Sequence, residues 1–328
     1  MKKLPLNYLR NIIIIGLVIL SFSCSKKNDD TVTGFTSTKP GANAFVTAFI
    51  SDINADTLSA YTLWLQNMQP RFMLSANRRN VAVSIKNKFI QLGLTNTVLD
   101  SFYVTNYYKD TTYNTWQFNV IATVTGSQYP DSLYIVGAHY DAILNPPGNP
   151  WLGSPGADDD GSGVASLLEM GRVIIKRGFT PKSSIKLIAF GAEELNMEGS
   201  LDYTTKAMLG NKKIRWMLNN DMISYENHAN TADWKVNLMD YANSGDLRVS
   251  AENYVSMYTD LGKIHDSTAN KEGDSYNFYL KGYKAIFFIS AASTPYYHQL
   301  TDVVGNCNFP YCREVTKVTC AMLVDQNR

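Results

Sequence analysis

The hydrophobic positions of this chain have helical spacing in its first part and strand-like spacing soon after. Residues from about 42 to 92 carry an apolar stripe at helical intervals that ends before Gly93. Strand-like runs follow at 98–104 and 116–125. The next run, 133–138, is hydrophobic almost throughout, which is typical of a strand buried on both faces.

Further along the chain, apolar runs alternate with amphipathic stretches. The pattern predicts strands at 185–190, 214–218 and 285–290, and helices at 164–175, 200–209, 247–261 and 315–322. Alternation of strands and helices is typical of a mostly parallel sheet. We therefore expect an α/β fold, a mostly parallel twisted sheet with helices on both faces.

The first residues of the chain resemble a targeting segment. Basic residues precede a short apolar stretch at 12–20, and Cys24 follows within a few residues, as in the lipidation signal of bacterial lipoproteins. We expect 1–23 to be a lipoprotein signal peptide, 24–41 a flexible tether and 42–328 a folded domain. The protein would then be anchored by lipid to a membrane of the cell envelope, facing the periplasm or the exterior. The alternative is a plain cleaved signal in which the cysteine is incidental.

Composition narrows the possible classes of protein. The 328 residues carry a formal net charge of +1 and are 45% hydrophobic, so a large core can form and nucleic acid is not an expected partner. Beyond Cys24, the chain has Cys307, Cys312 and Cys320. In an oxidising compartment the first two of these are close enough in sequence to pair, and the alternative is that all three are free thiols.

Histidine and carboxylate residues follow the predicted strands at several places. They are His139 and Asp141, the aspartates at 158–160, Glu193 and Glu194, Asp221, and His298. Because the carboxyl ends of parallel strands meet at one edge of a sheet, we expect these side chains to lie close together. A mixed set of imidazoles and carboxylates is typical of zinc in catalytic sites rather than in closed structural sites.

The same set suits a pair of zinc ions. One of the aspartates at 158–160 can bridge two ions, which together hold a water molecule and a scissile carbonyl. One of Glu193 and Glu194 can bind metal while the other accepts the proton of the water as general base. Asp141 lies two residues after His139 and suits a carboxylate that accepts the other imidazole N–H and so orients the ring.

Five segments, GAHYDA, PGADDDGSG, AFGAEELNMEGS, NNDMIS and YHQLTD, resemble in order and spacing the co-catalytic di-zinc aminopeptidases of the bacterial leucyl aminopeptidase type. The resemblance extends from about Arg71 to the C-terminus. It implies a phosphorylase/hydrolase-like α/β fold and makes 42–328 a zinc peptidase catalytic domain that acts on peptides. It also implies a division of roles: His139 and Asp221 on one zinc ion, Glu194 and His298 on the other, Asp159 bridging them, Glu193 as general base, and Asp141 orienting His139.

Two features depart from the pattern of that family. The family's SDH segment stands here as GDS at 273–275, so that only the aspartate is kept. The tyrosine with which some members stabilise the oxyanion has two candidates in this chain, Tyr225 and Tyr276. The proline-rich loop 145–151 is expected to form a rim beside the site.

We therefore expect a zinc-dependent exopeptidase, an aminopeptidase that removes N-terminal residues from peptides through a metal-bridged water with Glu193 as general base. The alternative is a glutaminyl cyclase, which resembles this chain in fold but uses a single zinc ion. That family usually lacks the DDDGSG segment and commonly has tryptophan where this chain has Tyr297. A non-catalytic binding lipoprotein is a third possibility, and the complete ligand set with its base argues against it.

Overall fold

The computed structural model describes residues 39–328. The predicted signal peptide, Cys24 and nearly all of the predicted tether lie outside the described residues. The strands of the described chain are β1 (Thr97–Tyr108), β2 (Thr111–Val124), β3 (Tyr129–His139), β4 (Ser183–Phe190), β5 (Lys213–Asn220), β6 (Lys235–Met239), β7 (Gly262–Ile264) and β8 (Ala285–Ser290).

These strands form one mixed sheet in the order β1-β2-β4-β3-β5-β8-β6-β7. The four central strands, β4, β3, β5 and β8, are parallel to one another. Antiparallel pairing joins β2 to β4 and β6 to β8 on either side of them. The prediction of a mostly parallel α/β sheet is confirmed, and the parallel centre aligns the carboxyl ends of four strands along one edge.

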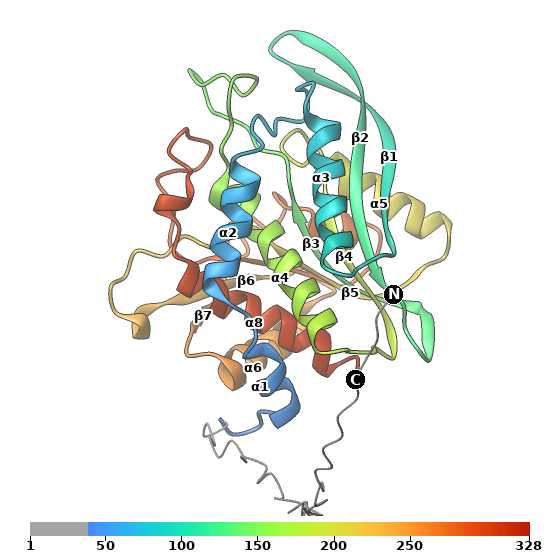
Figure 1. Ribbon diagram of the computed structural model, residues 1–328, viewed down its shortest axis with the longest axis vertical. Coiled ribbons are helices and arrows are strands. Elements are labelled where there is room, and N and C mark those ends of the chain that lie inside the picture. The colour runs from blue at the N-terminus through green and yellow to red at the C-terminus, as the bar shows by residue number, and fades with distance from the viewer. Residues whose placement is uncertain (1–38) are drawn as a thin grey trace, which may run out of the picture. The chain divides into compact units, whose positions relative to one another are not determined.

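Helices cover both faces of the sheet (Figure 1). They are α1 (Ala44–Ile50), α2 (Ala55–Gln66), α3 (Arg78–Gln91), α4 (Gly163–Lys176), α5 (Glu198–Leu209), α6 (Gly245–Tyr258), α7 (Ser275–Leu280) and α8 (Phe309–Asp325). Helix α4 packs against β3 and β4 and contacts α2, α3 and α8, whereas α5 and α7 contact each other in the second layer.

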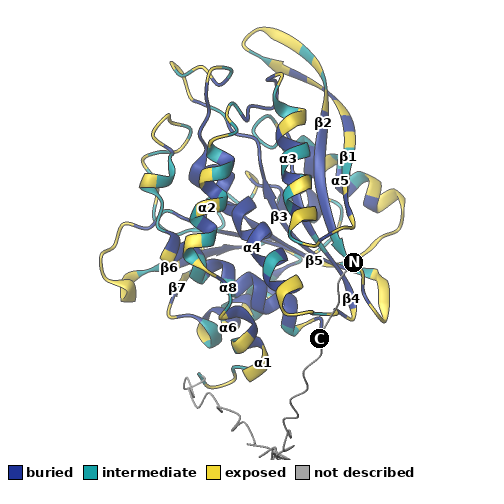
Figure 2. Cartoon of the chain, in the orientation of Figure 1, coloured by how far each residue is buried: buried dark blue, intermediate teal, exposed yellow. Residues whose placement is uncertain are grey.

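Strand β3 shows why its sequence is hydrophobic almost throughout. Ile135 belongs to one hydrophobic core and its neighbour Val136 to the other, because successive side chains of a strand point to opposite faces. Figure 2 shows the central strands and α4 in the colour of buried residues. Burial on both faces therefore explains the run predicted at 133–138.

The region 42–92, predicted to be helical, consists of the three helices α1, α2 and α3. Asn54 lies between α1 and α2. Its side chain accepts a hydrogen bond from the backbone N–H of Thr57 and so caps the start of α2. Gly93 has φ +98° directly after α3, a conformation that glycine adopts without the strain of a Cβ. The short elements β6, β7 and α7 were not predicted, because a few residues show too little periodicity to mark a strand or helix.

The three cysteines of the described residues are free, so of the two alternatives left open by the sequence the structure has free thiols rather than a Cys307–Cys312 disulfide. Cys312 is buried on the core side of α8, whereas the Cys307 thiol points to the Val303 carbonyl oxygen at 3.7 Å. Proximity in sequence did not bring the two sulfur atoms together, because the helix directs one of them into the core.

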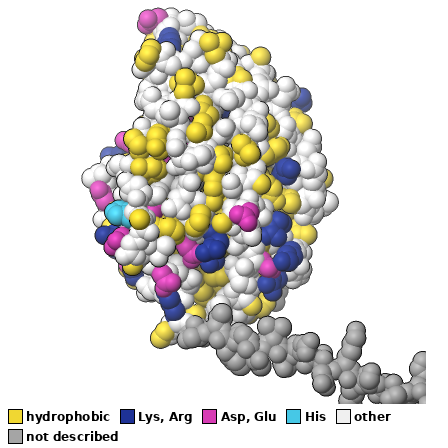
Figure 3. Space-filling model, turned by 60° about the vertical axis from the view of Figure 1, so that its left-hand side comes forward, with side chains coloured by type: hydrophobic (Ala, Val, Ile, Leu, Met, Phe, Trp, Pro, Cys, Tyr) yellow, Lys and Arg dark blue, Asp and Glu magenta, His cyan; other side chains and the backbone are white. Residues whose placement is uncertain are grey.

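Within residues 39–328, no helix is both long enough and apolar enough to cross a bilayer. On the face shown in Figure 3, lysine and arginine side chains lie among aspartate and glutamate side chains in the lower half. Charges of both signs are therefore mixed on that face.

Candidate active site

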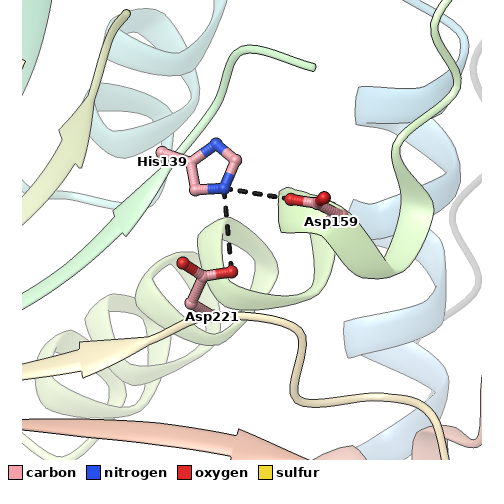
Figure 4. Close-up of side chains that lie close together, drawn as sticks. All are labelled: His139, Asp159 and Asp221. Carbon is pink, nitrogen blue, oxygen red and sulfur yellow. Dashed lines mark ion pairs between the residues drawn. The ribbon is translucent and has the colours of Figure 1, made fainter. Parts of the chain in front are cut away.

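The predicted metal ligands lie together at the carboxyl edge of the central strands. His139 is the last residue of β3 and Asp221 follows β5 directly, while Asp159 lies in the turn Ala157–Ser162 before α4. Glu194 follows β4, and His298 lies in the loop after β8. Figure 4 shows the side chains of His139, Asp159 and Asp221 pointing toward one another from three different elements.

These side chains form two groups that share one carboxylate. His139 Nε2 lies 3.1 Å from Asp159 Oδ1 and 3.7 Å from Asp221 Oδ1. His298 Nε2 lies 3.2 Å from Asp159 Oδ2 and 2.9 Å from Glu194 Oε2. Within each group the possible ligand atoms all lie within 4.8 Å of one another. Asp159 thus presents one oxygen to each group, as expected of a residue that bridges two cations.

The carboxylate of Asp160 binds backbone N–H groups and belongs to neither ligand group. Its carboxylate accepts hydrogen bonds from the backbone N–H groups of His139 at 3.1 Å, Gly163 at 2.9 Å and Met222 at 3.3 Å. These three residues belong to the ends of β3 and β5 and the start of α4. Asp160 therefore ties together the backbone segments that carry the ligands of the first group.

Two further residues support the site and were not assigned a role from the sequence. The carboxylate of Asp302 accepts hydrogen bonds from the backbone N–H groups of Asp158 at 2.8 Å and Asp159 at 3.1 Å. Asp302 is the aspartate of the YHQLTD segment, so its place four residues after His298 was an available signal.

The second of these residues is Arg71, of which 1% is exposed. Its guanidinium donates to the backbone carbonyl oxygens of Tyr140, Pro155 and Gly156, on both sides of the loop between β3 and Asp159. No local pattern in the sequence indicates this role, because the partners lie about 70 to 85 positions away.

Asp141 orients different groups from those predicted. The carboxylate accepts hydrogen bonds from the backbone N–H groups of Glu193 at 3.0 Å and Glu194 at 3.2 Å. The imidazole Nδ1 of His139 is 3.1 Å from the backbone carbonyl oxygen of Asp141, but 3.8 Å from the carboxylate Oδ1. The turn after β4, with Ala192 at φ +62°, directs its two amides at the carboxylate. The ring of His139 is therefore held by backbone, and Asp141 holds the two glutamates.

Buried carboxylates crowd this site. Burial, with repulsion from Asp159, raises the pKa of Glu194 to about 7, and burial also raises the pKa values of Glu193 and Asp221. His298 has a pKa of about 10, since burial is outweighed by its hydrogen bonds to Asp159 and Glu194. So many buried acids are costly without compensating charge, and a divalent cation in each group would supply it. The donor set fits zinc, which takes imidazole and carboxylate ligands.

Glu193 faces the site without a close partner for its carboxylate. Its Oε2 is 3.9 Å from His139 Nε2, beyond hydrogen-bonding distance. Glu194, by contrast, is engaged at both oxygens, with Oε1 accepting from the Ile143 backbone N–H at 3.1 Å and Oε2 near His298. The neighbouring glutamates therefore differ in how many of their carboxylate oxygens have a hydrogen-bonding partner.

The ligands line a small pocket of about 90 Å³. The residues around it are His139, Asp159, Glu193, Glu194, Asp221, Met222, Ala269, Glu272, Phe287, Ile289, Tyr297 and His298. Neither predicted oxyanion tyrosine is among them. Tyr276 packs against two other tyrosine rings and Tyr225 against the ring of Tyr296. The phenol that lines the pocket is Tyr297, whose ring stacks on His298 with centroids 3.8 Å apart.

The loop 145–151 is attached to the site. The backbone N–H of Asn145 donates to the carbonyl oxygen of His298 at 2.9 Å, and the Trp151 ring packs edge-on against Phe72 with centroids 4.9 Å apart. The predicted rim is therefore anchored at both ends, next to the second ligand group.

Comparison with known proteins identifies the family of this chain. Residues 119–323 match Peptidase family M28. A probable aminopeptidase of Saccharomyces cerevisiae is 27% identical over 218 residues, which are 64% of this chain and 57% of the yeast protein. A probable leucine aminopeptidase of Arthroderma otae is 28% identical over 63% of this chain and 56% of its own length. The chain thus spans little more than half the length of these curated relatives.

Solved structures share the fold. The LapA aminopeptidase of Legionella pneumophila superposes with a TM-score of 0.72 at 21% identity, covering 88% of this chain and 75% of the other. A glutaminyl cyclase of Bacteroides thetaiotaomicron superposes with a TM-score of 0.64 at 16% identity, covering 84% of this chain and 98% of the other. The match at 119–323 runs from β2 into α8 and includes the strands and loops that carry every predicted ligand. The chain belongs to peptidase family M28.

Proposed function

We propose that this protein is a zinc-dependent aminopeptidase that hydrolyses the N-terminal residue from peptides. One observation carries the proposal. The carboxylate of Asp159 places Oδ1 3.1 Å from His139 Nε2 and Oδ2 3.2 Å from His298 Nε2. A single carboxylate set between two imidazoles, each with a further carboxylate beside it, suits two metal ions better than one.

The residues of the two ligand groups can be divided between two zinc ions. His139 and Asp221 would hold the first zinc ion, Glu194 and His298 the second, with Asp159 shared. Zinc ions there would supply Lewis acidity, which polarises the scissile carbonyl and acidifies water. Glu193 would accept the proton of the attacking water and pass it to the leaving amine, because its carboxylate faces the site and is not engaged by another side chain within hydrogen-bonding distance.

The alternative function is that of a glutaminyl cyclase. It needs an experimental test because a glutaminyl cyclase has the same fold as this chain. The complete first ligand group, His139 with Asp159 and Asp221, favours hydrolysis, since a single-zinc enzyme has no use for both groups. The curated relatives from Saccharomyces cerevisiae and Arthroderma otae are named as probable aminopeptidases, which supports the same choice.

The test combines metal analysis with a panel of substrates. We expect the purified protein to bind two zinc ions per chain and to release the first residue of peptides with a free N-terminus, but not of N-acetylated peptides. A chelator should abolish the activity and zinc should restore it. Full activity at one zinc per chain, or conversion of N-terminal glutamine to a cyclic product without hydrolysis, would instead identify the cyclase.

A further inference from the structure

A second, larger pocket adjoins the catalytic pocket. The second pocket has a volume of about 360 Å³ and shares Met222, Ile289 and Tyr297 with the first. Together with Phe287, these residues make the wall beside the metal ligands largely apolar. A substrate held at the metal ligands therefore has apolar surface and free volume next to it.

Glu272 is the one charged residue of the catalytic pocket that is not placed among the metal ligands and the base. It lies in the loop between β7 and α7, and its side chain is exposed. None of the lysine or arginine ion pairs formed within residues 39–328 involves Glu272. Its carboxylate is therefore available to a charged group of a ligand.

Apart from the two histidines at the metal site, the charged residues that line the two pockets are all acidic. Lysine and arginine are absent from the lining residues of both pockets, whereas the second pocket adds Asp158 and Asp266. Asp158 is 4% exposed, and its Oδ2 has no hydrogen-bond partner among the described residues. Two zinc ions would compensate the ligand carboxylates, whereas Glu272 and these two aspartates form no ion pair with lysine or arginine among the described residues.

We propose that Glu272 selects substrates whose N-terminal residue has a cationic side chain, lysine or arginine. The inference rests on the proposed aminopeptidase function and names its substrate class. The apolar wall formed by Met222, Phe287 and Ile289 suits the methylene stem of such a side chain, and the carboxylate at the exposed margin suits its charged end. Because Glu272 is exposed, the pair forms without the desolvation cost of a fully buried ion pair.

The test compares lysine with norleucine, which has the same unbranched stem but no ammonium group. In wild-type protein loaded with zinc, we expect kcat/KM for a lysyl anilide to exceed that for a norleucyl anilide about two- to fivefold, the contribution of a solvent-exposed ion pair. Glu272→Gln should remove most of this ratio, and Glu272→Lys should shift the preference toward a glutamyl anilide. Asp131→Asn is the matched control, because exposed Asp131 lies at the opposite end of β3, and the ratio should not change.

The proposal is overturned by a wild-type ratio near one, or by a Glu272→Gln protein that loses activity on lysyl and norleucyl substrates equally. The second result would mean that Glu272 contacts the α-amino group common to all substrates. Calorimetric binding of free L-lysine and free L-norleucine to the zinc-loaded protein gives the same comparison without turnover. Failure to hydrolyse any anilide counts against the aminopeptidase function, whereas the calorimetric ratio still decides the role of Glu272.

Discussion

At the scale of single residues, the adjacent glutamates after β4 show how neighbours in sequence take different roles. Glu194 is engaged at both carboxylate oxygens, one by the Ile143 amide and one beside His298. The carboxylate of Glu193 has its nearest imidazole nitrogen at 3.9 Å. A carboxylate that is already held suits a metal ligand, whereas one that only faces the site suits an acceptor of protons.

Substituting each glutamate in turn tests this division. Glu193→Gln should retain both zinc ions but reduce kcat by about 10²- to 10⁴-fold, because the attacking water loses its proton acceptor. Glu194→Gln should instead weaken the binding of one zinc ion. Zinc content by mass spectrometry and kcat on one peptide substrate measure the two effects separately. Loss of metal from Glu193→Gln, with activity restored by excess zinc, would mean that the roles are reversed.

At the scale of elements, the side chain of Asp141 joins the turn after β4 to the end of β3. Asp141 accepts two backbone hydrogen bonds from that turn, from Glu193 and Glu194. Its own carbonyl oxygen lies 3.1 Å from the His139 ring. Asp141 therefore sets the relative position of His139, Glu193 and Glu194, which come from the ends of two different strands.

Replacing this carboxylate by an amide should loosen the arrangement. Asp141→Asn keeps the shape but turns one acceptor into a donor that faces a backbone N–H, so we expect zinc affinity or kcat/KM to fall about 10- to 100-fold. Asp131→Asn, the same change at the other end of β3, is the control and should leave both values unchanged. Wild-type values in the Asp141→Asn protein would show that the two amides do not need the carboxylate.

At the scale of the whole molecule, the site links stability to pH and metal. Without metal, Glu194 has a pKa of about 7 and Asp302 of about 8, both above the ordinary carboxyl value mainly because of burial. The unfolded chain releases these protons at lower pH, so the folded state holds more protons between about pH 4.5 and about pH 7 and loses stability as pH rises. His298, with a pKa of about 10, acts in the same direction above about pH 6.5.

We therefore expect the Tm of the chelator-treated protein to fall between about pH 5 and about pH 8. Zinc reverses the dependence, because its ligands must be deprotonated and its binding strengthens with pH. The gap in Tm between zinc-loaded and metal-free protein should thus widen across this range. Differential scanning calorimetry at fixed ionic strength measures both curves, and a metal-free Tm that rises over the same range would contradict the assignment of these buried acids.

The position of the molecule in the cell is a separate proposal. We propose that Cys24 carries lipid and anchors the protein to a membrane, because it follows a basic start and a short apolar stretch. Stable anchoring needs more than one acyl chain, at about 0.8 kcal/mol per buried methylene. Cys24→Ser should block processing or release the protein into the soluble fraction, as measured by fractionation and mass spectrometry of the N-terminus. Unchanged membrane association with normal cleavage would show that the cysteine is incidental.

The sequence by itself determined where the main strands end and which chemical groups stand at those ends. Runs such as 133–138 and 185–190 are hydrophobic at nearly every position, with Lys186 the exception, because both faces of the central strands are covered. His139, Glu193, Glu194 and Asp221 could thus be placed at one edge of the sheet before any contact was known. The short elements β6, β7 and α7 contain too few residues to show such a hydrophobic pattern.

Only the tertiary structure decided which atoms meet. The residues alone left open which of three aspartates faces both imidazoles, and the structure shows that Asp159 does while Asp160 binds backbone. The structure also shows that the Asp141 carboxylate has different partners from those predicted. It places Tyr297 rather than Tyr276 at the pocket and includes Glu272 in the pocket lining. These contacts join segments far apart in the chain, and their partners depend on strand order, on turn conformation and on which side chains the core buries. Local periodicity carries no information about any of these.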